Sequence, residues 1–190
     1  MLKAITLDNF ISKTDAQALV RFAESIETWD NDGVDSFWNN RSLNAINIYH
    51  HHNRDIGLYL YELRSRMAIA MASAYGESAL YPDLFQIVRW FPGQEQTPHA
   101  DDMTDQEGEG LDWYAHRHYG SILYLNDDYG GGHTYYPQHN FEIIPKAGTL
   151  AMHPGTPDHM HGVTPIENSI RYTIASFWSR DKEHLDEWIF

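Results

Sequence analysis

Apolar residues recur at helical spacing in two segments of the N-terminal part of the chain. The first segment, residues 12–28, has one apolar face, made by Ala16, Leu19, Val20, Phe22 and Ala23. The spacing of Thr14 and Gln17 predicts a capping box at its start. The second segment, residues 54–75, is followed by Gly76 as the expected C-cap and is apolar at Ile56, Leu60, Leu63, Met67, Ala70 and Met71. We therefore predict two amphipathic helices.

The residues between these two helices, 30–53, are polar and aromatic, and they predict a loop. We expect one short strand within it, at residues 45–49. Three consecutive histidines, His50-His51-His52, have the residue type of a metal site. Because consecutive side chains of an extended chain point in opposite directions, we interpret them as a polar surface segment.

Beyond Gly76, short β-rich runs replace the helical pattern. They cover residues 84–91, 120–125, 133–136, 141–144, 149–153 and 171–178, and turn residues separate them. We predict one domain over residues 1–190 that is mainly β with N-terminal helices (α+β). In this interpretation residues 1–80 form a helical buttress, and residues 81–180 form the β core.

Composition and charge narrow the classes of function. The formal net charge of −14 would repel a polyanion, so we expect no nucleic-acid partner. No apolar run is long enough to span a bilayer, so we expect no membrane partner. The N-terminal residues lack the apolar core of a signal peptide and cysteine is absent, so we expect a cytoplasmic protein. Oligomeric state stays open.

The absence of cysteine also limits the metal chemistry, because any transition-metal site must then use His, Asp and Glu. His99-Ala100-Asp101 follows a predicted strand, and residues two apart on an extended chain point to the same face. A distant histidine would complete a triad of two histidines and one carboxylate, which leaves three coordination positions of iron(II) free. On residue type the candidates are His153, His159 and His161.

Arg171 lies within an apolar strand-like run and therefore needs an anionic partner. A buried guanidinium forms a bidentate pair with a carboxylate, so the carboxylate of a bound ligand would suit this position. An internal ion pair with Asp or Glu is the alternative.

Residues 84–178 resemble the iron(II)/2-oxoglutarate-dependent oxygenase superfamily, in its prolyl 4-hydroxylase-like branch. The motifs that carry the resemblance are the segment 89–93 leading to His99-Ala100-Asp101, the segments 124–127, 131–137 and 145–148, and His161-Gly162-Val163 followed by Arg171-Tyr172. The resemblance implies a double-stranded β-helix (jelly-roll, cupin-like) fold. It also implies His99, Asp101 and His161 as catalytic iron ligands, Arg171 as the anchor of 2-oxoglutarate and Tyr124 as a hydroxyl donor to the co-substrate.

The resemblance further implies Fe(II), 2-oxoglutarate and O2 as cofactor and co-substrates, with ascorbate as a candidate reductant. The expected reaction is hydroxylation of a C–H bond in a small-molecule or peptide substrate, either a prolyl residue or a free amino acid. Asp101 argues against halogenation, because related halogenases have a small residue there. Two alternatives stay open: a cupin-like metal-dependent dioxygenase that does not use 2-oxoglutarate, and a non-catalytic metal-binding jelly-roll protein.

Three residues are candidates for substrate contact. Arg117 matches the position of an arginine that contacts peptide substrate in relatives, and Phe177 matches a tryptophan that stacks on substrate proline. By strand alternation, Phe177 should share the face of Arg171. Trp113 lies in the acidic stretch 102–115, which directly follows the proximal ligands, and we expect this stretch to form a mobile lid over the site.

Overall fold

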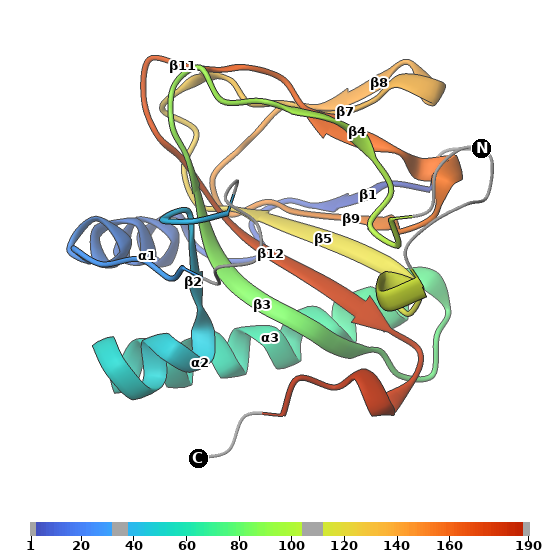
Figure 1. Ribbon diagram of the computed structural model, residues 1–190, viewed down its shortest axis with the longest axis horizontal. Helices are drawn as coiled ribbons and strands as arrows, with labels where there is room; N and C mark the ends of the chain where they lie inside the picture. Colours follow the sequence, from blue (N-terminus) through green and yellow to red (C-terminus); the bar gives the residue numbers. More distant parts are fainter. Residues whose placement is uncertain (1–2, 32–37, 104–111, 188–190) are drawn as a thin grey trace.

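The computed structural model describes residues 3–31, 38–103 and 112–187. Two antiparallel sheets face each other, and helices cover the outer face of the larger sheet (Figure 1). This arrangement is the double-stranded β-helix that the sequence resemblance implies.

The two predicted helices are present. Helix α1 (Lys13–Glu24) begins after Ser12, whose hydroxyl accepts a hydrogen bond from the backbone N–H of Asp15 at 3.0 Å. The predicted cap at Thr14 is therefore wrong, because Ser12 is the N-cap and Thr14 lies inside the helix. Helix α3 (Arg54–Tyr75) ends at Gly76 as predicted, with φ at 71°, a left-handed conformation that favours glycine.

The segment between these helices differs from the prediction. Strand β2 (Ser42–Asn44) comes earlier than expected, and helical turns occupy α2 (Ala45–Asn47) and the π-helical η1 (Ile48–His52). The Asn44 side chain accepts a hydrogen bond from the Ile46 N–H at 3.1 Å, which caps the turn and ends the strand. The three histidines 50–52 are exposed, in agreement with a surface segment.

The larger sheet has six strands in the order β1-β9-β5-β12-β3-β2, and each neighbouring pair is antiparallel. Besides β2, its strands are β1 (Ile5–Leu7), β9 (Leu150–Pro154), β5 (Tyr119–Tyr124), β12 (Arg171–Ser179) and β3 (Tyr81–Trp90). The four longest match predicted runs to within about three residues. Strands β1 and β2 are too short to show a periodic pattern.

The smaller sheet has the order β4-β10-β7-β8 and lies over the inner face of the larger one (Figure 1). Its strands are β4 (Gln96–His99), β10 (His161–Val163), β7 (Thr134–Tyr136) and β8 (Phe141–Ile143). A separate pair is formed by β6 (Gly130–Gly131) and β11 (Ile166–Glu167). Short 3-10 turns complete the described elements at Asp112–Tyr114, Pro137–His139, Pro157–His159 and Lys182–His184.

Alternation along the strands divides the larger sheet between two environments. Its outer face packs on α1 and α3 through buried side chains such as Phe85, Leu123, Met152, Ile174 and Trp178. Alternate residues on the inner face point into the space between the two sheets, where the candidate site lies. No helix within the described ranges is both long and apolar enough to cross a membrane.

Candidate active site

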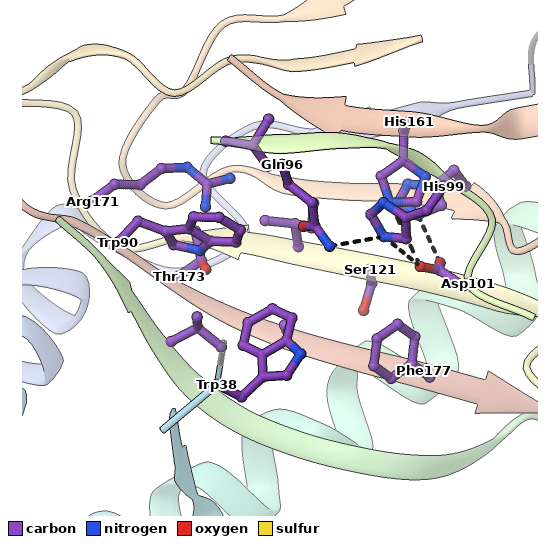
Figure 2. Close-up of a pocket in the computed structure, with 15 residues that line it drawn as sticks. Trp38, Trp90, Gln96, His99, Asp101, Ser121, His161, Arg171, Thr173 and Phe177 are labelled. Atoms are coloured by element: carbon purple, nitrogen blue, oxygen red, sulfur yellow. Dashed lines mark hydrogen bonds and ion pairs between the residues drawn. The ribbon is translucent and has the colours of Figure 1, made fainter. Parts of the chain in front are cut away.

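A cavity between the two sheets brings the predicted chemistry-bearing residues together (Figure 2). Arg171 lies toward one end, and His99, Asp101 and His161 lie toward the other. The apolar part of its wall consists of Trp38, Val88, Trp90, Ile122, Val163, Ala175 and Phe177. A cationic group and a set of possible metal ligands therefore share one cavity with largely apolar walls.

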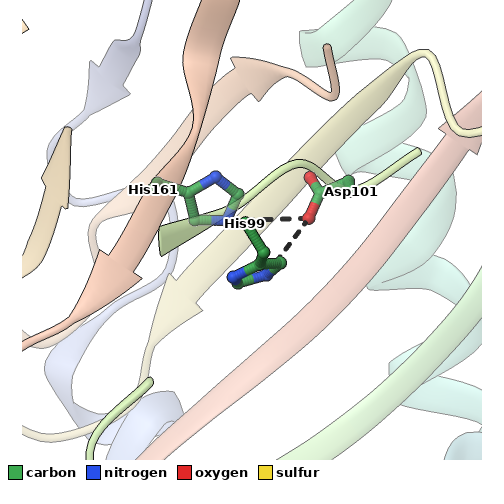
Figure 3. Close-up of side chains that lie close together, drawn as sticks. All are labelled: His99, Asp101 and His161. Atoms are coloured by element: carbon green, nitrogen blue, oxygen red, sulfur yellow. Dashed lines mark ion pairs between the residues drawn. The ribbon is translucent and has the colours of Figure 1, made fainter. Parts of the chain in front are cut away.

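Strand pairing in the smaller sheet assembles the possible metal ligands. Strands β4 and β10 are antiparallel neighbours whose register places His161 directly opposite His99. Asp101 follows two residues after His99, and its Oδ1 lies 3.9 Å from His99 Nε2 and 3.6 Å from His161 Nε2 (Figure 3). The three donor atoms all lie within 4.8 Å of one another. One metal ion can therefore be reached by all three side chains.

Backbone carbonyls fix the orientation of both histidine rings. His99 Nδ1 lies 3.1 Å from the Thr97 carbonyl, and His161 Nδ1 lies 3.2 Å from the His159 carbonyl. Because a carbonyl can only accept, each Nδ1 carries a proton, and the Nε2 atoms, which both face Asp101, are the nitrogens available to a metal ion. Metal-binding histidines are commonly held in this way, so the donor set suits a first-row metal ion.

Burial and mutual contact set the protonation of this cluster. Burial raises the pKa of the Asp101 carboxyl, but the neighbouring His161, His153 and His99 outweigh it, and the pKa is held well below its usual range. Burial lowers the pKa of His161 to about 3, and His153 adds to the effect. The site therefore presents a carboxylate and a neutral imidazole near neutral pH, the protonation states that bind metal.

The other two candidate histidines play different parts. His153 Nε2 lies 3.0 Å from Asp101 Oδ2, so that nitrogen donates to the carboxylate and has no lone pair to offer. His159 Nε2 instead accepts a hydrogen bond from the backbone N–H of Lys3 at 3.2 Å. Among the described residues, His99, Asp101 and His161 form the one group of three that could hold a metal ion.

Arg171 is 1% exposed and points into the cavity from β12. Its Nε donates to the Gly132 carbonyl at 3.1 Å, whereas its buried Nη2 has no hydrogen-bond partner among the described residues. A buried guanidinium nitrogen without a partner is costly. The internal ion pair considered as an alternative is not present among the described side chains, and an anionic ligand in the cavity would satisfy this nitrogen.

The tyrosine predicted to assist Arg171 lies beside it. The guanidinium carbon of Arg171 lies 5.4 Å from the centre of the Tyr124 ring. The Tyr124 hydroxyl shares a 2.7 Å hydrogen bond with Thr134, and burial raises its pKa. Tyr124 thus remains protonated at neutral pH and able to donate.

Of the three candidate substrate residues, one lines the cavity and two do not. Phe177 lines the cavity and shares its face with Arg171, whereas Trp178 points to the helices, as alternation predicts. Arg117 stacks on Phe177 at 4.0 Å and pairs with Asp83 at 2.7 Å, and it is not among the residues that line the cavity. Trp113 is 79% exposed. Most of the predicted lid, residues 104–111, lies outside the described residues.

Sequence reasoning missed several residues of the cavity wall. Thr173 and Ala175 lie between Arg171 and Phe177 on β12, so strand alternation alone was a sufficient signal for them. Trp38 has no comparable signal, because it precedes β2 in a segment without periodicity. His153 is a candidate ligand by residue type, but its position along the chain does not indicate a contact with the Asp101 carboxylate.

Comparison with known proteins identifies a family whose model matches this chain. The family model for the 2OG-Fe(II) oxygenase superfamily matches residues 85–179, which span β3 to β12. Prolyl 3-hydroxylase 3 of Mus musculus is 30% identical over 101 residues, 47% of this chain and 14% of its own length. A protein of Acanthamoeba polyphaga mimivirus, named as a candidate prolyl 4-hydroxylase, is 29% identical over 109 residues, 52% of this chain and 45% of its own length.

Solved structures support the fold. The viral collagen prolyl hydroxylase of Paramecium Bursaria Chlorella virus-1, in complex with 2-oxoglutarate, superposes with a TM-score of 0.67 at 16% identity and covers 95% of this chain and 97% of its own. A Trichoplax adhaerens prolyl hydroxylase, in complex with a hypoxia-inducible-factor peptide, also gives 0.67, at 15% identity and with 97% and 86% covered. At these identities the likeness concerns the fold. The chain spans less than half the length of the two sequence relatives.

Proposed function

Because the chain belongs to the 2OG-Fe(II) oxygenase superfamily, we propose that it is an Fe(II)- and 2-oxoglutarate-dependent dioxygenase that hydroxylates a C–H bond of its substrate. One observation carries the proposal. A single cavity has a possible metal site, His99, Asp101 and His161, toward one end and the unsatisfied guanidinium of Arg171 toward the other. These are the two anchors that a metal-chelating dicarboxylate requires.

In this proposal the two histidine Nε2 atoms and Asp101 Oδ1 hold iron(II). Both rings turn Nε2 toward the metal position, and the carboxylate is ionised, so binding requires little rearrangement. Three protein ligands leave the remaining positions of an octahedral ion for the co-substrates. When bound, iron(II) and 2-oxoglutarate supply the activation of O2 that inserts one oxygen atom into a C–H bond, with succinate and CO2 as the other products.

Arg171 recognises the distal carboxylate of 2-oxoglutarate in this proposal. Its Nη2 is buried and free to donate, and its Nε is held by the Gly132 carbonyl, so the guanidinium is oriented before a ligand arrives. Tyr124, in contact with Arg171, assists as a hydroxyl donor. The apolar walls between the two ends exclude water from the reacting groups.

The substrate class we propose is a prolyl residue in a peptide, with a free amino acid as the second possibility. Phe177, Trp38 and Trp90 give the cavity an aromatic wall, and flat aromatic faces pack well against an uncharged ring. Several relatives that this chain resembles are named prolyl hydroxylases.

Anaerobic titration of the wild-type protein with iron(II) and then 2-oxoglutarate tests the cofactor requirement. We expect a weak visible charge-transfer band that appears only when both are present. Without this band the protein would not use 2-oxoglutarate, and a cupin-like dioxygenase with its own chelating substrate or a non-catalytic metal-binding protein would be favoured.

A substrate screen under air then identifies the reaction. Proline-containing peptides and free amino acids are compared by succinate formation, and each hit is examined by mass spectrometry for the gain of one oxygen atom. Oxidation of a free amino acid with no effect on any peptide would overturn the prolyl-peptide assignment but not the dioxygenase assignment.

A further inference from the structure

The two oxygens of the Asp101 carboxylate have different partners. Oδ1 faces His99 and His161, at 3.9 and 3.6 Å from their Nε2 atoms. Oδ2 is held by His153 Nε2 at 3.0 Å. Asp101 and His153 are 4% and 1% exposed, so this hydrogen bond is sheltered from water. The carboxylate therefore has one oxygen directed at the metal position and one directed away from it.

A tyrosine supports His153 from the other side. The hydroxyl of Tyr136 lies 2.8 Å from His153 Nδ1, and Tyr136 is fully buried. The carboxylate can only accept, so His153 Nε2 carries a proton. Hydrogen bonds thus join Tyr136 to His153 and His153 to Asp101, and His153 donates the second of them.

The fold makes room for this chain of hydrogen bonds at Gly120. The β5–β9 register places Gly120 directly opposite His153. A Cβ atom at Gly120 would lie 1.9 Å from Asp101 Oδ2 and 2.5 Å from His153 Nε2. Only a residue without a side chain is compatible with the His153–Asp101 contact, which indicates that the contact is built into the sheet.

We propose that His153, supported by Tyr136, is a positioning residue that holds Asp101 to a single metal bond through Oδ1. The inference rests on the proposed function and adds residues to its metal site. A carboxylate can bind a metal through both oxygens, and a second bond would occupy a position needed by 2-oxoglutarate or O2. By engaging Oδ2, His153 keeps that position open and lowers the cost of ordering the site.

Metal binding by variants at His153 tests the proposal without turnover. Groups that orient a metal ligand typically contribute about 10- to 100-fold to metal affinity. We expect His153→Leu, which fills a similar volume without a donor, to weaken Co(II) binding to the metal-free protein by about this factor. His153→Gln offers an N–H close to the position of Nε2, and it should recover most of the affinity. The shape of the Co(II) d–d band, which depends on coordination number, should change in His153→Leu and return in His153→Gln.

His116→Leu is the matched control. It also replaces a histidine by leucine, but the His116 ring stacks on His184 and pairs with Asp83, and it contacts none of the three candidate ligands. We expect its Co(II) affinity and d–d band to equal those of the wild type. If His153→Leu does not fold, Tyr136→Phe is tested in its place, and a smaller loss with a changed band is expected because only the supporting hydroxyl is removed.

The outcomes separate this inference from the proposed function. Wild-type affinity and an unchanged band in both His153→Leu and Tyr136→Phe would overturn the positioning role while leaving the dioxygenase proposal intact. Equal losses in His153→Leu and His153→Gln would also overturn it, since they would reflect general packing. A wild-type protein that binds neither Co(II) nor iron(II) would overturn both.

Discussion

The two ends of the cavity differ in how far the protein itself satisfies their buried polar groups. At the metal end, each Nδ1 donates to a backbone carbonyl and Asp101 Oδ2 accepts from His153, so the atoms left for a ligand are the two Nε2 atoms and Oδ1 that face the metal position. At the other end, Arg171 uses one nitrogen for the Gly132 carbonyl and leaves Nη2 buried without a partner among the described residues. The metal end is thus largely organised by the protein, whereas the arginine end is completed only by a ligand.

This difference follows from how each end is built. The metal end draws on β4, β9 and β10, and each of its three candidate ligands is held by a hydrogen-bonding neighbour. The arginine end depends on a single side chain from β12 beside Trp90 and Tyr124, which offer it ring faces 5.8 and 5.4 Å away. We therefore expect substitutions at the metal end to act together on all bound species and substitutions at the arginine end to act on one.

Gly120→Ala should have the largest effect, because it disturbs the metal end, which the protein itself organises. Its Cβ would overlap Asp101 Oδ2 and crowd His153, so the carboxylate must leave its position. We expect Co(II) affinity to fall by about 100-fold or more, measured by titration of the metal-free protein. Gly130→Ala is the matched control, because its Cβ would mainly meet the flexible Glu167 side chain. Retained Co(II) affinity in Gly120→Ala would show that the metal end is not rigid.

Arg171→Lys should affect the other end alone. The lysine keeps the charge but loses the planar fork, so the 2-oxoglutarate concentration for half-maximal charge-transfer absorbance should rise by about 10-fold or more. Co(II) affinity without 2-oxoglutarate should stay unchanged. Arg180→Lys, at a surface arginine paired with Glu77, is the control for this exchange. Equal losses of metal and co-substrate affinity in Arg171→Lys would mean that the two ends are not independent.

The sequence revealed most of the fold where periodic patterns are long. Helix α3 and its Gly76 cap follow from residue spacing, and the long strands β3, β5 and β12 follow from β-rich runs bounded by turn residues. Residues 45–49 were wrongly predicted as a strand, because their β-rich composition outweighed the Asn44 side-chain cap that begins a helical turn there. Short elements such as β1 have too few residues to reveal a period.

The candidate site shows the same division. His99, Asp101 and Arg171 could be proposed from strand geometry and residue chemistry, and the sequence resemblance pointed to His161 among three histidines. The contact between His153 and Asp101 depends on the β5–β9 register and on the space at Gly120, which spacing along the chain does not reveal. Trp38 reaches the cavity from a segment without periodicity, so only the tertiary structure reveals it.

Trp38→Ala should have a moderate effect confined to the wall between the two ends. Trp38 lines the cavity and meets Trp90 edge to face at 5.9 Å. Loss of this packing surface should lower substrate-dependent succinate formation by about 10-fold, with metal and 2-oxoglutarate binding preserved. Trp113→Ala is the matched control, because Trp113 is 79% exposed. A larger loss in Trp113→Ala than in Trp38→Ala would favour the predicted lid over the observed wall as the substrate contact.

The smallest expected effect concerns the acid sensitivity of the fold, as distinct from that of the metal end. His118, just before β5, accepts a hydrogen bond at Nδ1 from the backbone N–H of Arg180, at 3.2 Å. Burial, followed by the charge of Arg180, lowers its pKa below the ordinary value of 6.5. As pH falls through 6.5 the unfolded chain binds a proton that the folded protein resists, so this contribution to stability is present above that pH and lost below it.

His118→Gln keeps an acceptor but removes the titration. We expect its free energy of unfolding to fall less steeply than that of the wild type between about pH 8 and pH 5.5, as measured by urea denaturation of the metal-free proteins. His159 and His161, whose pKa values are also lowered, are common to both proteins and cancel in the difference. Parallel curves for the two proteins would assign the acid sensitivity to groups other than His118, such as the histidines of the metal end.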